Sequence, residues 1–258
     1  MDIYQHFRKD EQPFIDQVLS WKDDVETMYQ SRLTNFLNPR EQKIIETLIG
    51  KEHDVIHYDF FGGHASAERK RALLAPFYES LEMDRFQITV LEAKYHTKFA
   101  QIEHPDILGS FLGLGIERKK IGEIIVSDGV IQIVIASEIA SYVQANFTKI
   151  RNTKVNFTEI APHELQLAEL NWKEQAYTAS SLRLDAFISE IYKLSRKISQ
   201  EIIAKKYVKV NFKVIEDSKY MLNEGDMLSV RGKGRSKLDQ INGKTKKDRI
   251  RFTASILQ

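Results

Sequence analysis

Charge is distributed unevenly along this 258-residue chain, and the imbalance separates an acidic body from a basic C-terminal part. Residues 181–258 hold 18 Lys and Arg against 9 Asp and Glu, a formal charge of +9. Residues 1–180 hold 20 basic and 27 acidic residues, a formal charge of −7. A small basic unit attached to an acidic body suits a protein that grips a phosphate-bearing partner through one part. A solvated basic tail would give the same charge totals. The sequence pattern within the basic part therefore has to distinguish a phosphate-binding unit from such a tail.

The overall composition is that of a globular protein long enough for two or three small domains, with 42% hydrophobic and 29% charged residues. The absence of cysteine excludes disulfides, thiolate zinc sites and a cysteine nucleophile, and it suits a reducing cytoplasm. The N-terminus has no basic-then-apolar signal segment, and the longest apolar runs, such as Val130 to Ala136, are too short to cross a bilayer. We therefore expect a soluble cytoplasmic protein with no membrane partner.

Residues 1–81 are expected to form a mainly helical N-terminal domain. Pro13 suits a first helical turn, and apolar residues then recur at helical spacing: Phe14, Val18, Trp21, Val25 and Met28. Asn38-Pro39-Arg40-Glu41 indicates a second helix start, and its buried face and end would be Ile44, Ile45, Leu48, Ile49 and Gly50. Residues 55–61 indicate a strand, and residues 68–74 indicate a helix that ends at Pro76. The basic run Arg69-Lys70-Arg71 is either a solvated helix face or a secondary RNA contact.

Residues 82–165 alternate between strand and helix in the order βαββαβ. The expected strands are 86–95, 122–126, 130–136 and 155–160, and the expected helices are 106–114 and the segment from Ser137-Glu138 through Ile139, Tyr142, Val143, Phe147 and Ile150. Asp128-Gly129 supplies the positive φ angles of a tight hairpin. This order is the ferredoxin-like plan of RNA-recognition modules. The plan hosts many functions, and the aromatic signature of a working RNA-recognition sheet is missing.

Residues 166–180 are expected to be a polar connector, and residues 181–258 a small α+β domain with a basic extension at 237–251. Ser180 and Ser181 are good helix caps for a first helix, whose buried face would be Leu184, Phe187, Ile188 and Ile191. Ser195 can cap a second short helix that holds Ile198, Ile202 and Ile203. Strands are expected at 207–212 and 228–230.

Spaced motifs in this last part resemble the S-four RNA-binding domain over residues 182–235. The matching stretches, in order, are Leu182-Arg183-Leu184-Asp185, Leu194-Ser195-Arg196-Lys197, Val208-Lys209-Val210-Asn211 and Val230-Arg231-Gly232. The resemblance implies two short helices packed on a small twisted sheet. It also implies that the second helix and nearby loops grip structured RNA.

Ten residues of this region are candidates for RNA contact: Arg183, Ser195, Arg196, Lys197, Lys205, Lys206, Lys209, Arg231, Lys233 and Arg235. Arg196 and Lys197 stand in the first turn of the second helix, where free backbone N–H groups and the helix dipole favour an anion. The other cations are expected around that turn. Arg183 could instead form an ion pair with Asp185 or Asp226, and Lys205 and Lys206 could be a solvated helix end.

Two positions depart from the pattern of the domain. Many relatives have Gly where Lys206 stands, and many have Asn-Gly where this chain has Asn211-Phe212. A residue other than Gly at positive φ costs about 1 kcal/mol. The turn at Lys206 is therefore the place where a different local geometry is expected.

Further motifs narrow the resemblance to YlmH-type proteins, which are bacterial three-part proteins with a C-terminal S-four domain. The motifs are Phe61-Gly62-Gly63, Ala67-Glu68-Arg69-Lys70-Arg71, the stretch 104–109 and the stretch 112–124. The resemblance implies a ribosome-associated protein that binds rRNA or a ribosome–tRNA complex and handles stalled large subunits that hold peptidyl-tRNA. It also implies that the gene lies near cell-division genes and that the protein has division-related protein partners.

Catalysis is the main competing hypothesis, because S-four domains often accompany enzymes. Arg183-Leu184-Asp185 resembles the Arg-Leu-Asp motif of pseudouridine synthases, but here it lies inside the S-four helix. The glycines at 109, 113 and 115 end a helix instead of opening one, and His53, His57 and His64 lack a metal-site frame. We expect a non-catalytic protein without cofactor or metal. An RNA-modifying enzyme and a cell-division adaptor remain the alternatives.

Overall fold

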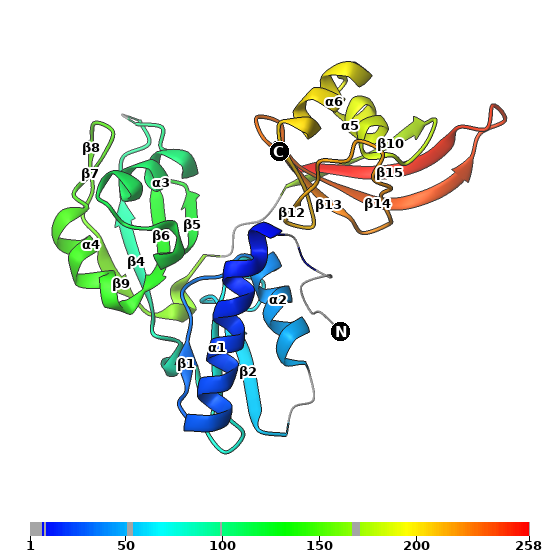
Figure 1. Cartoon of the computed structure of the whole chain (residues 1–258). Helices are drawn as coiled ribbons and strands as arrows, with labels where there is room; N and C mark the ends of the chain where they lie inside the picture. The colour runs from blue at the N-terminus through cyan, green and yellow to red at the C-terminus, as the bar shows by residue number, and fades with distance from the viewer. Residues whose placement is uncertain (1–6, 8, 51–53, 99, 167–170, 258) are drawn as a thin grey trace. The chain divides into compact units, whose positions relative to one another are not determined.

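The computed structural model describes residues 7, 9–50, 54–98, 100–166 and 171–257, which fall into two compact units (Figure 1). The first unit, Met1–Ala168, contains both segments expected to be N-terminal and middle domains. The second unit, Glu169–Gln258, contains the S-four region and all that follows it. None of the helices formed by the described residues has the length and hydropathy to cross a membrane.

The N-terminal part of the first unit packs two helices on a small sheet. Its elements are α1 (Gln12–Met28), β1 (Arg32–Leu33), α2 (Pro39–Ile49), β2 (Ile56–Phe61) and β3 (Arg71–Pro76), with strand order β1-β3-β2. The predicted start of α2 is confirmed, because the Asn38 side chain accepts hydrogen bonds from the N–H groups of Arg40 and Glu41. The Glu41 carboxylate accepts one in return from the Asn38 N–H.

One expectation for this part is wrong. Residues 71–76 form the strand β3 between β1 and β2, not the end of a helix, and all six residues are buried. Ala-Leu-Leu-Ala favours a helix by propensity, but burial between two strands overrides that preference. Met28 is the last residue of α1 and the last of the apolar residues at helical spacing, and it is 66% exposed.

The middle part of the first unit has the predicted ferredoxin-like plan. Its elements are β4 (Ile88–Lys94), α3 (His104–Gly113), β5 (Ile121–Ser127), β6 (Val130–Ala136), α4 (Ala140–Asn146) and β9 (Thr158–Ile160), with a side hairpin β7 (Lys149–Ile150) and β8 (Thr153–Lys154). The sheet order is β5-β6-β4-β9, and all neighbours are antiparallel. Asp128 and Gly129 take the positive φ angles expected of the hairpin turn. Two details were wrong: Val155 precedes the last strand, and Ile150 lies in β7 instead of the helix.

Both faces of this middle sheet are covered. One face packs against α3 and α4, and its core includes Ile107, Phe111, Val143 and Phe147. The other face is closed by Phe36 from the segment between β1 and α2 and by Leu165. Phe36 is 1% exposed, and a Cβ added to Gly122 would lie 2.6 Å from its ring. The face that an RNA-recognition module presents to RNA is therefore filled by this chain's own residues.

The second unit is a six-stranded antiparallel sheet with two short helices against it (Figure 1). Its elements are β10 (Trp172–Ala179), α5 (Leu184–Ile191), α6 (Arg196–Ala204), β11 (Val208–Val210), β12 (Lys213–Val214), β13 (Met227–Val230), β14 (Gly234–Lys244) and β15 (Ile250–Leu257). The strand order is β10-β15-β14-β13-β11-β12. The core confirms the predicted buried face of α5, since Leu184, Phe187, Ile188 and Ile191 all lie in it.

Three sequence-based expectations for the second unit are corrected. Residues 172–179 of the supposed connector form β10, while residues 167–170 lie outside the described part. The supposed basic extension is mostly β14 and β15, and Leu238 and Phe252 are fully buried in the core. The N-cap of α5 is Arg183 and not Ser180 or Ser181. The strand β10 at the start of the second unit and the strands β14 and β15 at its end thus complete the six-stranded sheet.

Candidate nucleic-acid interface

A buried carboxylate organises the start of both helices in the second unit. The Asp185 side chain is 0% exposed. Its Oδ1 accepts from Arg183 Nε at 3.2 Å and lies 3.0 Å from Arg196 Nη2. Its Oδ2 accepts from Arg183 Nη2 at 3.0 Å and from Gln200 Nε2 at 2.9 Å. Asp185 therefore joins α5 to α6 and fixes two of the predicted cations in place.

These contacts also decide the charge state of Asp185. Burial alone would raise the pKa of the carboxyl, but hydrogen bonds from Gln200 and Arg183 and the charge of Arg196 outweigh it. The pKa of Asp185 consequently lies below its ordinary value. A buried, ionised and fully bonded carboxylate holds structure together. Of the two partners left open for Arg183, Asp185 is the one it takes, while Asp226 accepts from Asn211 Nδ2 at 2.7 Å.

The first turn of α6 presents a cation beside free backbone N–H groups, as the sequence predicted. Ser195 is the N-cap, and its hydroxyl accepts from the Ile198 N–H at 3.2 Å. Lys197 is exposed, and no hydrogen bond or ion pair to it is found among the described residues. Arg196 is 42% exposed while it contacts Asp185. Ser195 thus acts through the cap, and Lys197 is the side chain most available to a phosphate there.

The other end of α6 is closed by a Schellman motif that uses Lys206 in place of glycine. The Tyr207 N–H donates to the Ile202 carbonyl at 3.1 Å, and the Lys206 N–H donates to the Ile203 carbonyl at 2.9 Å. Lys206 takes φ +62°, so the turn keeps the glycine geometry despite the substitution. Asn211 and Phe212 likewise take φ +48° and +66° in the tight turn between β11 and β12. The expectation of a different local geometry at Lys206 is therefore wrong, because both departures keep the positive φ angles that glycine would adopt.

Beyond this turn the surface is hollowed by a groove of about 520 Å³ between the end of α6, β11, β13 and the β13–β14 turn. We call it the basic groove, and its lining consists of Lys205, Lys206, Tyr207, Lys209, Ser229, Val230, Arg231, Gly232, Gly234 and Arg235. None of these ten described residues carries a carboxylate, although Glu216 reaches Lys206 Nζ at 3.3 Å. Gly232 and Gly234 in this lining take φ +77° and +86°, angles that glycine adopts without steric cost.

Tyr207 is a groove residue that the sequence reasoning missed. Its side chain is among the exposed large hydrophobics, and the Arg231 guanidinium carbon lies 4.9 Å from its ring centroid. The Arg231 N–H also donates to the Tyr207 carbonyl at 2.9 Å. An aromatic ring and a guanidinium stacked in this way form a platform that suits a nucleobase as well as a phosphate. The signal was present in the sequence, because Tyr207 stands between Lys206 and Lys209.

Nine of the ten predicted residues thus separate into two clusters instead of one. Arg183, Ser195, Arg196 and Lys197 lie at the start of α6, whereas Lys205 and Lys206 follow its end, about 13 Å away along nine residues. Lys209, Arg231 and Arg235 join the second cluster in the basic groove. Lys233 is exposed in the turn between the two glycines, outside the groove lining. The expectation that all cations surround the helix N-terminus is wrong.

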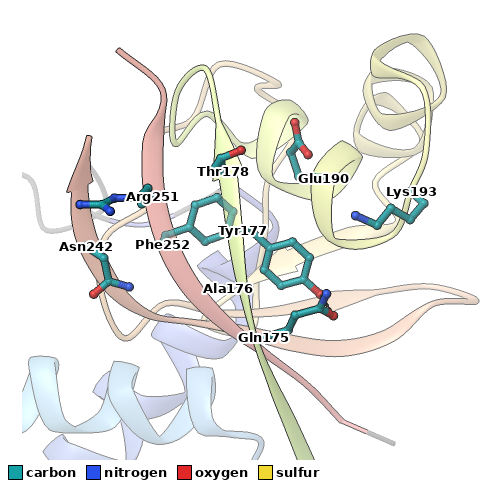
Figure 2. Close-up of a pocket in the computed structure, with 9 residues that line it drawn as sticks. All are labelled: Gln175, Ala176, Tyr177, Thr178, Glu190, Lys193, Asn242, Arg251 and Phe252. Atoms are coloured by element: carbon teal, nitrogen blue, oxygen red, sulfur yellow. Dashed lines mark hydrogen bonds between the residues drawn. The ribbon is translucent and has the colours of Figure 1, made fainter. Parts of the chain in front are cut away.

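A second hollow of about 560 Å³ lies along β10 and β15 (Figure 2). Tyr177 stacks on Phe252 with ring centroids 5.7 Å apart, and Lys193 Nζ lies 5.4 Å from the Tyr177 ring centroid. Figure 2 shows the Arg251 side chain pointing away from Lys193, on the other side of β15. The cations here do not converge, so the basic groove is the better candidate for RNA.

The basic run of the first unit is structural. Arg71 is 4% exposed and donates to the carbonyls of Thr34 and Gln87 at 2.7 and 2.9 Å. Arg69 donates to the Phe36 carbonyl at 2.8 Å. Arg118 bonds backbone carbonyls nearby, and burial together with the charge of Arg69 lowers its pKa to about 10. These side chains hold Phe36 and its neighbours on the middle sheet, and the solvated-helix reading of the run is wrong.

The histidines do not form a metal site in the described part of the chain, where no group of three or more His, Asp or Glu side chains could hold an ion. His64 Nε2 lies 2.6 Å from Glu123 Oε2, and its Nδ1 lies 3.0 Å from the Ser66 hydroxyl. Glu123 also accepts from the Glu68 N–H at 2.8 Å. These contacts tie the loop after β2 to β5. His53 lies outside the described residues.

Comparison with known families accounts for most of the chain. Three family models match: "YlmH, N-terminal" over residues 10–79, "Putative RNA-binding domain in YlmH" over residues 82–164, and "S4 domain" over residues 182–228. The chain belongs to the YlmH family. It is 42% identical over 252 residues to "Ribosome-associated protein quality control protein P2" of Bacillus subtilis, covering 98% of this chain and 97% of that protein.

A solved structure from the same family resembles part of the fold. "Cell division protein ylmH from Streptococcus pneumoniae" matches with a TM-score of 0.54 and 34% identity, over 63% of this chain and 98% of that chain. The YlmH family assignment and the C-terminal S4 domain predicted from sequence are therefore confirmed. This chain is a homologue of a ribosome-associated quality control protein and carries RNA-binding domains.

Proposed function

We propose that this protein is a non-catalytic factor that binds rRNA of the large ribosomal subunit through its second unit. The basic groove carries the proposal, because it gathers Lys205, Lys209, Arg231 and Arg235 around the Tyr207 ring without a carboxylate in its lining. Phosphates would contact the cations, and an unpaired base would stack on the aromatic platform. Lys197 at the start of α6 would add a contact about one helix length away.

The cellular role that fits this site is the handling of stalled large subunits that still hold peptidyl-tRNA. The B. subtilis relative carries ribosome-associated quality control in its name, and it aligns with this chain over nearly its full length. A groove that reads shape and phosphates suits an RNA whose position on the ribosome is fixed. In this proposal the protein acts in the cytoplasm and makes contact with rRNA first, with tRNA as a second RNA partner.

Crosslinking in living cells followed by RNA sequencing tests the proposal. Crosslinked reads should concentrate at a few sites of large-subunit rRNA, and they should drop several-fold in a Lys209→Ala, Arg231→Ala double variant. A matched Lys213→Ala, Lys219→Ala variant loses the same charge outside the groove lining and should keep them. Reads spread evenly over messenger RNA, or equal loss in both variants, would contradict the proposal.

The two alternatives have their own readouts. An RNA-modifying enzyme would leave a base of rRNA unmodified in cells that lack the protein, and sequencing of that rRNA detects it. The buried and fully bonded Asp185 favours the non-catalytic account. A division adaptor, suggested by the name of the pneumococcal relative, would co-purify with division proteins after nuclease treatment.

A further inference from the structure

Large hydrophobic side chains are concentrated on one small region of the first unit. Of the eleven that are exposed in the described part of the chain, five lie in two short stretches, residues 28–29 and 77–83. We call this region the aromatic patch, and its members, all between 56% and 71% exposed, are Met28, Tyr29, Phe77, Tyr78 and Met83. Single exposed hydrophobics are ordinary, but a contiguous group marks an interaction surface.

Ring geometry joins the three aromatic members of the patch across the sequence gap. The centroids of Tyr29 and Tyr78 lie 6.5 Å apart, and those of Phe77 and Tyr78 lie 5.5 Å apart at an interplanar angle of 84°. Tyr29 is the C-cap of α1 in the left-handed conformation, which turns the chain toward β1. Three aromatic rings from two separate segments thus form one surface.

A polar network joins the two segments that carry the rings. The Ser31 hydroxyl donates to Glu79 Oε2 at 2.6 Å, and Arg85 Nη2 lies 3.3 Å from the same hydroxyl and bonds Glu79. The hydrogen bond from Ser31 and the charge of Arg85 hold the pKa of Glu79 below its ordinary value. A cleft of about 240 Å³ adjoins the network, lined in part by Leu33 and Leu73. The surface is therefore prearranged, which lowers the entropic cost of binding.

The charge around the patch selects the partner. Residues 22–32 and 77–85 hold three cations and six carboxylates, a formal charge of −3. Each of the cations is matched within these stretches: Lys22 with Glu26, Arg32 with Asp24, and Arg85 with Glu79. The side chains of Asp23, Glu82 and Asp84 have no such partner among the described residues. The C-terminal end of the α1 dipole adds further negative potential.

We propose that the aromatic patch docks a basic segment of another protein, one that carries apolar side chains beside Lys or Arg. Aromatic and Met side chains supply the contact area, and the unmatched carboxylates attract the cations of the partner. Nucleic acid would be repelled by the same carboxylates. The protein would then have two contacts of opposite kind: RNA at the basic groove, as proposed above, and a protein at the aromatic patch.

Site-specific photo-crosslinking in cells tests this docking surface. Tyr78 is replaced by p-benzoyl-phenylalanine, and Tyr142, an exposed tyrosine on α4, is replaced in the same way as the matched control. From position 78 we expect an adduct that survives nuclease, is destroyed by protease, and contains a partner peptide rich in Lys or Arg. Phe77→Ser should reduce its yield at least fivefold, and Glu82→Lys with Asp84→Lys should do the same while leaving the rings intact.

Three results would overturn the proposal: a nuclease-sensitive adduct, an adduct to a second copy of this chain, or a yield no higher than from position 142. Phe77 is 62% exposed, so its substitution should leave the fold intact, and the thermal unfolding curve checks this. Crosslinked rRNA reads from the Phe77→Ser protein separate the two proposals. If the Phe77→Ser protein still gives crosslinked rRNA reads but no longer gives the protein adduct, the docking proposal is supported. If the wild type gives no crosslinked rRNA reads, only the proposed RNA function is rejected.

Discussion

The middle sheet of the first unit and the sheet of the second unit treat their second face in opposite ways. In the middle sheet, six of the seven residues of β6 are buried, because helices cover one face and Phe36 with Leu165 closes the other. In the C-terminal sheet, β11 alternates between buried and exposed, and its exposed Lys209 enters the basic groove. An α+β fold associated with RNA binding therefore does not by itself provide an RNA surface. Whether a sheet can provide an RNA surface depends on whether one of its faces carries cations and remains exposed.

The largest expected effect comes from uncovering the middle sheet with Phe36→Ala. Loss of this fully buried ring should destabilise the first unit by about 3–5 kcal/mol, because a cavity remains where it packed. Urea unfolding followed by Trp21 fluorescence reports this unit, and a Trp172→Phe background removes the other tryptophan of the chain.

Leu112→Ala is the control, since Leu112 is 51% exposed on α3 and its loss should cost less than about 0.5 kcal/mol. RNA affinity of the folded Phe36→Ala protein should equal that of the wild type. Unchanged stability of the first unit would contradict the closed-face account.

The next effect concerns the carboxylate that supports the open surface. Asp185→Ala should destabilise the second unit by about 2–3 kcal/mol, because Arg183, Arg196 and Gln200 lose a charged hydrogen-bond partner. Trp172 fluorescence in a Trp21→Phe background measures this unit. Glu201→Ala removes an exposed acid from the neighbouring helix α6 and should change little.

The pH dependence has a definite sign. Because the folded pKa of Asp185 is depressed, its stabilisation is present above the ordinary carboxyl pKa of about 4 and is lost as pH falls through the folded value. The stability difference between wild type and Asp185→Ala should therefore shrink below about pH 4. A difference that stays constant from pH 7 to pH 3 would count against the ionised network.

The smallest effect separates stability from binding at Lys206. Glycine adopts φ +62° without the steric cost of about 1 kcal/mol that lysine has there. Because glycine also loses more conformational entropy on folding, the two effects partly cancel. The Lys206→Gly protein should therefore be as stable as the wild type or up to about 1 kcal/mol more stable. RNA affinity should fall nonetheless, since a groove cation is gone. Lys219→Ala serves as the control for charge. Clear destabilisation by Lys206→Gly would mean that this Schellman turn is not strained.

Local signals in the sequence predicted much of this structure. The Asn38 cap, the Asp128-Gly129 turn and the Ser195 cap each depend on residues within a few positions of one another. The strand β10 was missed because it is an edge strand whose residues 173–176 are exposed, and three of these four are polar. The last two strands were missed because lysine-rich composition hides the buried positions Leu238 and Phe252.

The candidate site was predicted by residue type but not by arrangement. Motif order identified the ten residues, yet no local pattern shows that Lys209 and Arg235 meet across the sheet at one end of α6 while Lys197 stands at the other. The closure of the middle sheet by Phe36 is likewise a long-range contact, and it could not be read from the strand pattern.

The salt dependence of RNA binding tests the central claim most directly. Affinity for purified large-subunit rRNA is measured over a range of salt concentrations for the wild type, for Lys209→Ala with Arg231→Ala, and for the matched Lys213→Ala with Lys219→Ala. Each lost phosphate contact removes about 0.7–0.9 from the log–log slope, so the groove variant should bind more weakly with a slope flatter by about 1.5. The matched variant should keep the wild-type slope. Equal slopes in the wild type and the groove variant, with Trp172 reporting an intact fold, would contradict the claim that this groove grips RNA.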